Sequence, residues 1–324
     1  MNTKYIVSLG EILFDANPKT GLLTIGGAPS NWAINCHRLI SQKDIRTVVV
    51  SAVGNDLLGD AVMDFLDNCN IGSLIARVPG KPTSIVKVSY DKGNNPHYNI
   101  VEDVAWDYIG FEDAPPKQQV QLKDIQDNCC AVCWGTLGQR SPKSRQFIQD
   151  FVSAITSPNV IKVYDPNIRK KPDAETKKII YKSLLLANTI KVGHEEMDLI
   201  GEIFGLFPAI NNTSDENKGT KKDYLKRSQV LFDKFPNINS IIITLSHRGS
   251  HIFLRNGETS SMKTRKIKNV KPVGCGDSFL AGVIASLVSG KDLHYAHSKG
   301  AEVSRFVAQN DSATPELPQA YIID

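Results

Sequence analysis

The sequence lacks any apolar run that approaches the roughly 20 residues of a membrane-spanning helix. The long apolar core of a signal peptide is also missing, since the short apolar segment 5–9 is followed at once by Gly10 and Glu11. Cysteine is scarce, with 6 in 324 residues, and no second pair accompanies Cys130-x-x-Cys133 to complete a zinc site. We therefore expect a cytoplasmic protein with reduced thiols and no membrane partner.

A strong excess of one charge is absent as well. The chain has 38 Lys and Arg residues against 34 Asp and Glu residues, a net charge of +4 that is spread along the sequence. This balance gives no reason to expect nucleic acid as a partner. With 41% hydrophobic and 22% charged residues the composition is that of a globular protein, and the length allows two domains or one large α/β domain with an appendage.

Short apolar segments alternate with helical patterns through most of the chain. The expected strands are 5–9, 47–52, 129–134, 161–165, 189–192 and 240–245. The expected helices are 28–40, 59–68, 141–155, 174–187, 194–204, 221–234, 276–289 and 292–309. Because nearly continuous apolar strands separated by amphipathic helices are typical of parallel sheets covered on both faces, the pattern predicts an α/β fold.

Two stretches interrupt this alternation. Residues 14–25 and 84–109 lack a helical period and are expected to be extended strands, the second with a turn at 91–95. Strands outside the alternation indicate a small sheet appended to the core. Such a sheet is either a lid over a cleft or an antiparallel edge, and the pattern alone favours neither.

The most informative segment is 272–282, where Gly274, Cys275, Gly276 and Asp277 lead directly into an apolar helix. The glycines permit close approach of another group, and the free N–H groups and the dipole of a helix start bind anions. The segment is therefore either a phosphate cradle or a tight loop with an aspartate near the helix cap. It is neither a Walker A loop, since no Gly-Lys-Ser/Thr follows, nor a dinucleotide fingerprint.

Two further segments carry candidate binding residues. Gly26 and Gly27 precede the expected helix 28–40. Asn31, in the first turn of that helix, offers donors and acceptors that suit sugar hydroxyls. Asn167 and Arg169 directly follow an expected strand, where the ligand crevice of open α/β sheets lies, and Arg169 is suited to pairing with phosphate. Taken alone, the first segment is equally a turn before a helix and the second an Asp-Pro turn.

Together and in this order, these segments resemble the PfkB (ribokinase-like) family of carbohydrate kinases. The family's Gly-Gly-x-x-x-Asn signature is matched by Gly26, Gly27 and Asn31, and its Gly-Ala-Gly-Asp signature by 274–277. Further similar segments are 10–15, 53–59, 134–137, 165–169 and 313–315. The resemblance implies a ribokinase-like, doubly wound and mostly parallel sheet with helices on both faces, in a single domain over 1–324. It also implies that the strands at roughly 13–25 and 84–109 form a lid.

The resemblance implies a role for each matching residue. In the family, the aspartate at the position of Asp277 takes the proton from the sugar hydroxyl, and the preceding amides form an anion hole for the phosphoryl group. The implied catalytic residues are Asp277, Gly274, Cys275 and Gly276. The implied sugar-binding residues are Asp15, Gly26, Gly27, Asn31 and Arg169. The implied nucleotide-binding residues are Asn167, Glu196, Thr244 and Gly249, and Glu196 is expected to place Mg²⁺ through water.

Within the family, the segments 26–31, 102–107 and 135–141 are most similar to fructokinases. The implied reaction is ATP-dependent phosphorylation of the 6-hydroxyl of D-fructose. Two alternatives stay open: a kinase of the same family for another sugar, a sugar acid or a nucleoside, and a sugar-binding regulator without catalysis. The expected partners are thus a small sugar and ATP, and the edges of the lid strands offer a surface for a homodimer.

Four positions depart from the family pattern. Lys271 replaces an aspartate that commonly helps to form a monovalent-cation site, so we expect its ammonium to take the place of K⁺. Gly193 stands where the family has the asparagine of Asn-x-x-Glu, and Ser246 and Ser312 stand where it often has glycine. None of these departures removes Asp277.

Overall fold

The computed structural model describes residues 3–17, 20–90, 96–168, 171–209, 219–264, 267 and 270–324. The strands are β1 (Lys4–Leu9), β2 (Leu13–Ala16), β3 (Leu23–Gly26), β4 (Ile45–Gly54), β5 (Gly72–Val78), β6 (Ile85–Tyr90), β7 (Pro96–Asn99), β8 (Cys129–Trp134), β9 (Ile161–Tyr164), β10 (Thr189–Gly193), β11 (Ser240–Thr244), β12 (Ser250–Leu254) and β13 (Thr259–Met262). The α-helices are α1 (Ala28–Leu39), α2 (Leu57–Asn68), α3 (Pro116–Asp127), α4 (Pro142–Ala154), α5 (Ala174–Leu186), α6 (His194–Phe204), α7 (Lys221–Lys234), α8 (Cys275–Val288) and α9 (Leu293–Val307). None of the helices in these ranges is long and apolar enough to cross a membrane.

The central sheet has nine strands in the order β13-β12-β11-β10-β9-β8-β1-β4-β5. Its strands from β11 to β5 are parallel, and only β12 and β13 run antiparallel to their neighbours. The chain builds outward from β1 to β5 in one direction and then from β8 to β13 in the other. The order therefore reverses between β1 and β8, which is where open α/β sheets bind ligands.

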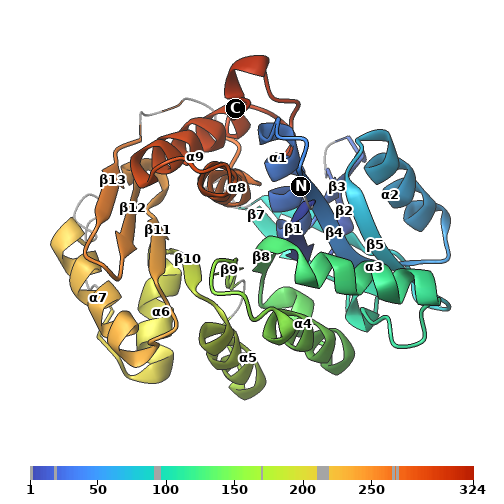
Figure 1. Ribbon diagram of the computed structural model, residues 1–324, viewed down its shortest axis with the longest axis horizontal. Coiled ribbons are helices and arrows are strands. Elements are labelled where there is room, and N and C mark those ends of the chain that lie inside the picture. The colour runs from blue at the N-terminus through green and yellow to red at the C-terminus, as the bar shows by residue number, and fades with distance from the viewer. Residues whose placement is uncertain are drawn as a thin grey trace.

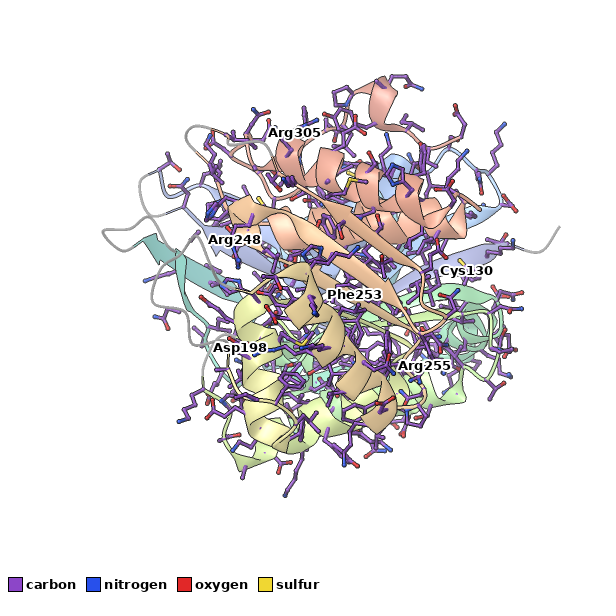
Figure 2. The ribbon with its side chains drawn as sticks, turned by 90° about the vertical axis from the view of Figure 1, so that its left-hand side faces the viewer. Cys130, Asp198, Arg248, Phe253, Arg255 and Arg305 are labelled. Carbon is purple, nitrogen blue, oxygen red and sulfur yellow. The ribbon has the colours of Figure 1, made fainter. Side chains whose placement is uncertain are left out.

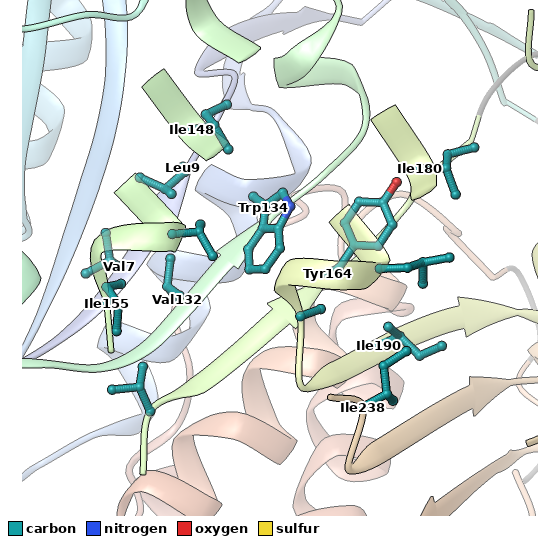
Figure 3. Packing of buried hydrophobic residues seen from close by; sticks show 14 of the residues in the cluster. Val7, Leu9, Val132, Trp134, Ile148, Ile155, Tyr164, Ile180, Ile190 and Ile238 are labelled. Carbon is teal, nitrogen blue, oxygen red and sulfur yellow. The ribbon is translucent and has the colours of Figure 1, made fainter. Parts of the chain in front are cut away.

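Helices cover both faces of this sheet, as expected for a doubly wound fold (Figure 1). One buried apolar cluster lies between the sheet and α3 to α7, and a second lies between the sheet and α1, α2, α8 and α9. Figure 3 shows part of the first cluster, in which Trp134 and Tyr164 from adjacent strands pack with ring centroids 6.0 Å apart. Burial on both faces explains why these strands are almost continuously apolar.

A second sheet has four strands in the order β3-β2-β6-β7. Its strands β2 and β6 come next in the chain after the carboxyl ends of β1 and β5. Strand β2 pairs antiparallel with β3 and parallel with β6, while β6 pairs antiparallel with β7. The expected extended strands in 14–25 and in the first half of 84–109 are thus confirmed. The turn expected at 91–95 lies outside the described residues.

The second half of 84–109 is not extended as expected. Residues Ala105–Tyr108 form a 3₁₀ helix in which the Asp107 carboxylate accepts a hydrogen bond from the Val104 amide at 3.1 Å. The Arg140 guanidinium donates to both Asp107 oxygens at 2.7 Å and stacks on the ring of buried Trp106, 3.9 Å from its centroid. This long-range clamp, rather than the local pattern, determines the backbone here.

Candidate active site

A cavity of about 290 Å³ lies at the reversal of strand order, between the carboxyl ends of the central strands, the small sheet and the start of α8. Its lining combines residues that follow β1, β8 and β9, residues of β2 and β6, and the loop before α8. It includes Asp15, Gly27, Asn31, Asn167, Gly274, Gly276 and Asp277 from the residues expected at the site. Segments far apart in the sequence therefore meet in one cavity.

The loop before α8 requires glycine at position 274. Gly274 adopts φ 78°, and an added Cβ would lie 2.5 Å from the Cβ of Ala313. The first hydrogen bond within the helix runs from the Ser278 amide to the Gly274 carbonyl at 2.9 Å, while the Cys275 amide donates to Pro272 at 3.3 Å. The amides of residues 276 and 277 precede that first helical bond and can bind an anion. The thiol of Cys275 stays protonated, because burial raises its pKa to about 12.

Asp277 lies in the first turn of α8 with 9% of its surface exposed. Asn31, on α1, donates from Nδ2 to Asp277 Oδ2 at 3.0 Å across 246 residues of sequence. The Oδ1 atom of Asn31 is buried and has no hydrogen-bond partner in the part of the chain that the structure describes. A carboxylate and an unsatisfied amide oxygen at one cavity wall suit a ligand that both donates protons and loses one.

Two acidic residues lie against the glycines that open α1, one with its carboxylate and one with its backbone. An added Cβ at Gly26 would lie 2.2 Å from Asp15 Oδ2, so the absence of a side chain there makes room for this carboxylate. Gly27 has φ 100°, and its added Cβ would lie 2.4 Å from the carbonyl oxygen of Glu11. Glu11 and Asp15 both line the cavity, and such carboxylates accept hydrogen bonds from sugar hydroxyls.

A buried ion pair closes the base of the cavity. The Nζ atom of Lys191, on β10, lies 3.2 and 3.1 Å from the two carboxylate oxygens of Asp165, which directly follows β9. Burial alone would lower the pKa of Lys191, but the carboxylates of Asp165, Glu196 and Asp277 outweigh it and raise this pKa to about 12. The ammonium is therefore charged at every physiological pH.

Glu196 lies behind this pair and outside the cavity lining. Its Oε1 accepts from the Ile168 amide at 2.8 Å and its Oε2 from the Gly193 amide at 2.7 Å, so it ties the loop after β9 to the start of α6. Burial raises the pKa of Glu196, and the Lys191 ammonium opposes that shift. Gly193 contributes its amide to this contact, although it lacks the side chain that the family pattern has there.

The expected nucleotide-binding residues of the β11–β12 loop do not line the cavity. Thr244 ends β11, and Gly249 has φ 107° with an added Cβ only 1.9 Å from the Met262 carbonyl oxygen. Ser246 adopts φ 53°, a left-handed conformation that glycine accepts more easily. Figure 2 views the molecule from this edge of the sheet, with Arg248 and Arg255 at opposite ends of β12.

The remaining residues that the sequence singled out lie in different surroundings. Asn167 lines the cavity with φ 48°, a conformation that asparagine tolerates, whereas Arg169 lies outside the described residues. Lys271 Nζ lies 2.5 Å from Asp311 Oδ1, and the Ser312 hydroxyl accepts from the Thr314 amide at 3.1 Å. Among the described residues, no group of three or more His, Cys, Asp or Glu side chains could hold a metal ion.

Glu11 and Lys191 both line the cavity, although no motif of the sequence predicted a role for either residue. A charged residue inside the apolar strand 189–192 is the signal that could have identified Lys191, because buried lysines need a charged partner. Glu11 follows an apolar strand at its carboxyl end, which is the same position that drew attention to Asn167.

Known proteins resemble this chain over nearly its whole length. A family model described as pfkB family carbohydrate kinase matches residues 4–320. The ATP-dependent 6-phosphofructokinase of Thermoanaerobacterium thermosaccharolyticum is 26% identical over 299 residues, covering 90% of this chain and 81% of that protein. The 5-dehydro-2-deoxygluconokinase of Geobacillus thermodenitrificans is 23% identical over 302 residues, covering 91% and 81%. The solved structure of fructokinase with bound ATP from Xylella fastidiosa matches with a TM-score of 0.75 at 18% identity, covers 98% of this chain and 95% of that chain, and confirms the fold.

Proposed function

Because this chain belongs to the pfkB family of carbohydrate kinases, and is thus a phosphotransferase acting on a sugar hydroxyl, we propose that it transfers the γ-phosphoryl group of ATP to the 6-hydroxyl of D-fructose. The observation that carries the proposal is the cavity that joins Asp277 and the start of α8 to Asp15, Gly27 and Asn31. A base, an anion-binding helix start and acceptors for hydroxyl groups are the parts that such a transfer needs.

The geometry supports a division of roles. Asp277 accepts the proton of the attacking hydroxyl, while the Asn31 amide holds one of its carboxylate oxygens at 3.0 Å. The amides in the first turn of α8 stabilise the negative charge of the transferring phosphoryl group. Asp15 and Glu11 orient the sugar by accepting hydrogen bonds from its other hydroxyls.

Fructose is favoured because the described part of the lining near α1 presents carboxylates and one carboxamide. Glu11, Asp15 and Asn31 suit an uncharged polyol, and the two carboxylates would repel a sugar acid or a sugar phosphate. The second candidate is a kinase for one of those charged sugars, which the names of the relatives that are 23% and 26% identical favour. We would expect Arg169 to pair with the carboxylate or phosphate of such a substrate.

We further propose that Mg²⁺ arrives on the phosphates of ATP, with Glu196 as a water-mediated contact. The described residues fit this arrangement, because both oxygens of Glu196 already accept a backbone N–H yet keep lone pairs for water. Bound in this way, Mg²⁺ would neutralise phosphate charge. ATP is a cytoplasmic metabolite, and we place the activity in the cytoplasm.

The first experiment is an ADP-release assay with Mg²⁺, ATP and a panel of fructose, ribose, adenosine, 2-keto-3-deoxygluconate, fructose 6-phosphate and 5-dehydro-2-deoxygluconate. Turnover confined to fructose supports the proposal. Turnover on another member keeps the chemistry and replaces the substrate. Folded protein that binds ATP but turns over none would favour a sugar-binding regulator instead.

We propose that Lys271 removes the need for a monovalent cation. Its ion pair with Asp311 links the loop before α8 to the loop after α9. An internal ammonium there would do what a bound cation does, because it supplies one fixed positive charge. Activity in KCl and in NaCl at equal ionic strength should be the same, and a large activation specific to K⁺ would refute this.

We also propose that the four-stranded sheet acts as a lid over the cavity and pairs with a second copy to form a homodimer. Leu23, which begins its edge strand β3, and Leu22, which precedes it, are 36% and 62% exposed, and this supports an apolar contact. Light scattering of the purified chain should give twice the monomer mass, and Leu22→Glu should return it to the monomer. A monomer in the wild type would end this proposal.

A further inference from the structure

Lys191 is a buried lysine in the middle of an apolar strand. Its neighbours Ile190 and Val192 are fully buried, and Lys191 itself is only 7% exposed. A buried ammonium is expensive unless it is paired, and here Asp165 provides the pair. Even so, the side chain points into the cavity, since both residues line it.

The ammonium also lies close to the start of α8. A Cβ added to Gly276 would lie 2.9 Å from Lys191 Nζ. Gly276 is not among the glycines with positive φ, so its backbone conformation is open to any residue. The room that its missing side chain leaves for the Lys191 ammonium therefore explains why glycine occupies position 276.

The charges around the cavity indicate what the Lys191 ammonium does there. Glu11, Asp15, Asp165 and Asp277 line it with carboxylates, and Lys191 is the one cation among the lining residues that the structure describes. A phosphoryl group placed on the amides of α8 would bring further negative charge into this acidic space. Beside the backbone dipoles of α8 and the Mg²⁺ that accompanies ATP, the Lys191 ammonium would be the fixed charge that attracts it.

We propose that Lys191 is a catalytic residue that donates an N–H to the phosphoryl group during transfer, and that Asp165 positions its ammonium. This inference rests on the proposed function. An ammonium has three donors, so the contacts to the two oxygens of Asp165 leave one for the phosphoryl group. The buried, unsatisfied Oδ1 of Asn31 independently marks the same cavity as a ligand site.

The chemical step is balanced without any change in Lys191. The sugar oxygen forms a bond to the γ-phosphorus, and its proton passes to Asp277. The bond from that phosphorus to the bridging oxygen breaks, and its electron pair leaves with the β-phosphate. Lys191 keeps its proton throughout and supplies charge where charge accumulates on the phosphoryl oxygens.

The test compares Lys191→Met with Lys162→Met. Lys162, on the neighbouring strand β9, is a matched control because it is also partly buried but donates to the carbonyls of Val152 and Ile155 outside the cavity. We expect Lys191→Met to lower kcat by about 10²–10³-fold with little change in the KM for the sugar. Lys162→Met should keep kcat within about threefold of the wild type. A folded Lys191→Met protein with kcat in that same range would overturn the proposal.

A binding measurement keeps this test separate from the proposed function. Calorimetry without sugar compares Mg·ATP with Mg·ADP, which differ in the γ-phosphate that Lys191 is proposed to contact. We expect Lys191→Met to weaken ATP binding by about 10-fold or more relative to ADP, the value of a charged hydrogen bond. If the wild type turns over no sugar, the proposed function fails, yet an unchanged ATP-to-ADP ratio would still refute the role of Lys191.

Lys191→Met leaves Asp165 as a buried charge without its partner and could prevent folding. The double variant Lys191→Met, Asp165→Asn removes both charges and provides a second protein for the same measurements. Asp165→Asn alone should lower kcat by about 10-fold in the wild type and have no further effect in the Lys191→Met background. Equal effects in both backgrounds would show that Asp165 does not act through Lys191.

Discussion

Gly274 and Gly290 form a natural pair for testing why the loop before α8 needs glycine. Both have φ 78°, so an alanine at either position carries the same backbone strain. They differ in their surroundings. A Cβ at 290 would meet nothing within 4 Å, whereas a Cβ at 274 would lie 2.5 Å from Ala313 Cβ and 2.6 Å from its Cα.

The magnitudes follow from this difference. Left-handed backbone costs a non-glycine residue about 1–2 kcal/mol, and replacing glycine returns about 0.4–1 kcal/mol by restricting the unfolded chain. Gly290→Ala should thus lower the free energy of unfolding by about 1 kcal/mol. Gly274→Ala adds an overpacked contact with backbone atoms, worth about 1–3 kcal/mol more. Because the contact displaces the start of α8, it should also lower kcat by about 10²-fold, while Gly290→Ala should leave kcat unchanged.

Urea unfolding and the ADP-release assay, applied to both variants and the wild type, measure these two quantities. Equal losses of stability would mean that the approach of Ala313 does not constrain the loop. Normal turnover by Gly274→Ala would refute the assignment of this loop to the phosphoryl group.

Three further predictions concern the site and its support. Asp277→Asn should lower kcat by about 10²–10⁴-fold through loss of the base, with ATP affinity by calorimetry unchanged, because the new side chain still offers Asn31 an oxygen; loss of ATP binding in folded protein would assign Asp277 another role. Asn31→Ala should raise the KM for the sugar and lower kcat by about 10-fold, since it frees the carboxylate that Asn31 holds, and steady-state kinetics that show neither change would contradict this. Burial between Ser250 and Ser260 lowers the pKa of His297 from 6.5 to about 4. As the pH falls, the unfolded chain therefore takes up this proton before the folded protein does, and stability that is present above pH 6.5 is lost toward pH 4. Urea unfolding should show a loss of about 2 kcal/mol between about pH 7 and pH 5 that His297→Gln lacks, and parallel pH profiles would show that another group is responsible.

Most of the central sheet was predictable because its segments are strongly periodic. Strand β8 and helices α6 and α7 have the expected bounds, and the other expected strands and helices differ at their ends by a few residues. The missed elements have weak local patterns. Helix α3 is mostly Gln, Lys and Asp, with Ile125 as its one buried residue. Strand β5 contains serine and arginine, and β12 and β13 are short and contain serine with histidine or threonine, so their strand pattern is weak.

The sequence by itself determined the positions where the backbone makes a local demand. Gly27 and Gly274 were recognisable from the sequence because a positive φ and a close neighbour exclude a side chain. Glycine is the residue that meets both conditions, so its presence alone indicates them. The tertiary structure alone decided which charges meet. Lys191 gains its ion-pair partner only because the parallel strand β9 places Asp165 beside it. Asn31 reaches Asp277 only because α1 packs against α8. Electrostatic interactions act through space over a few ångströms, so their partners follow from the order of the strands and the packing of the helices, which no local pattern contains.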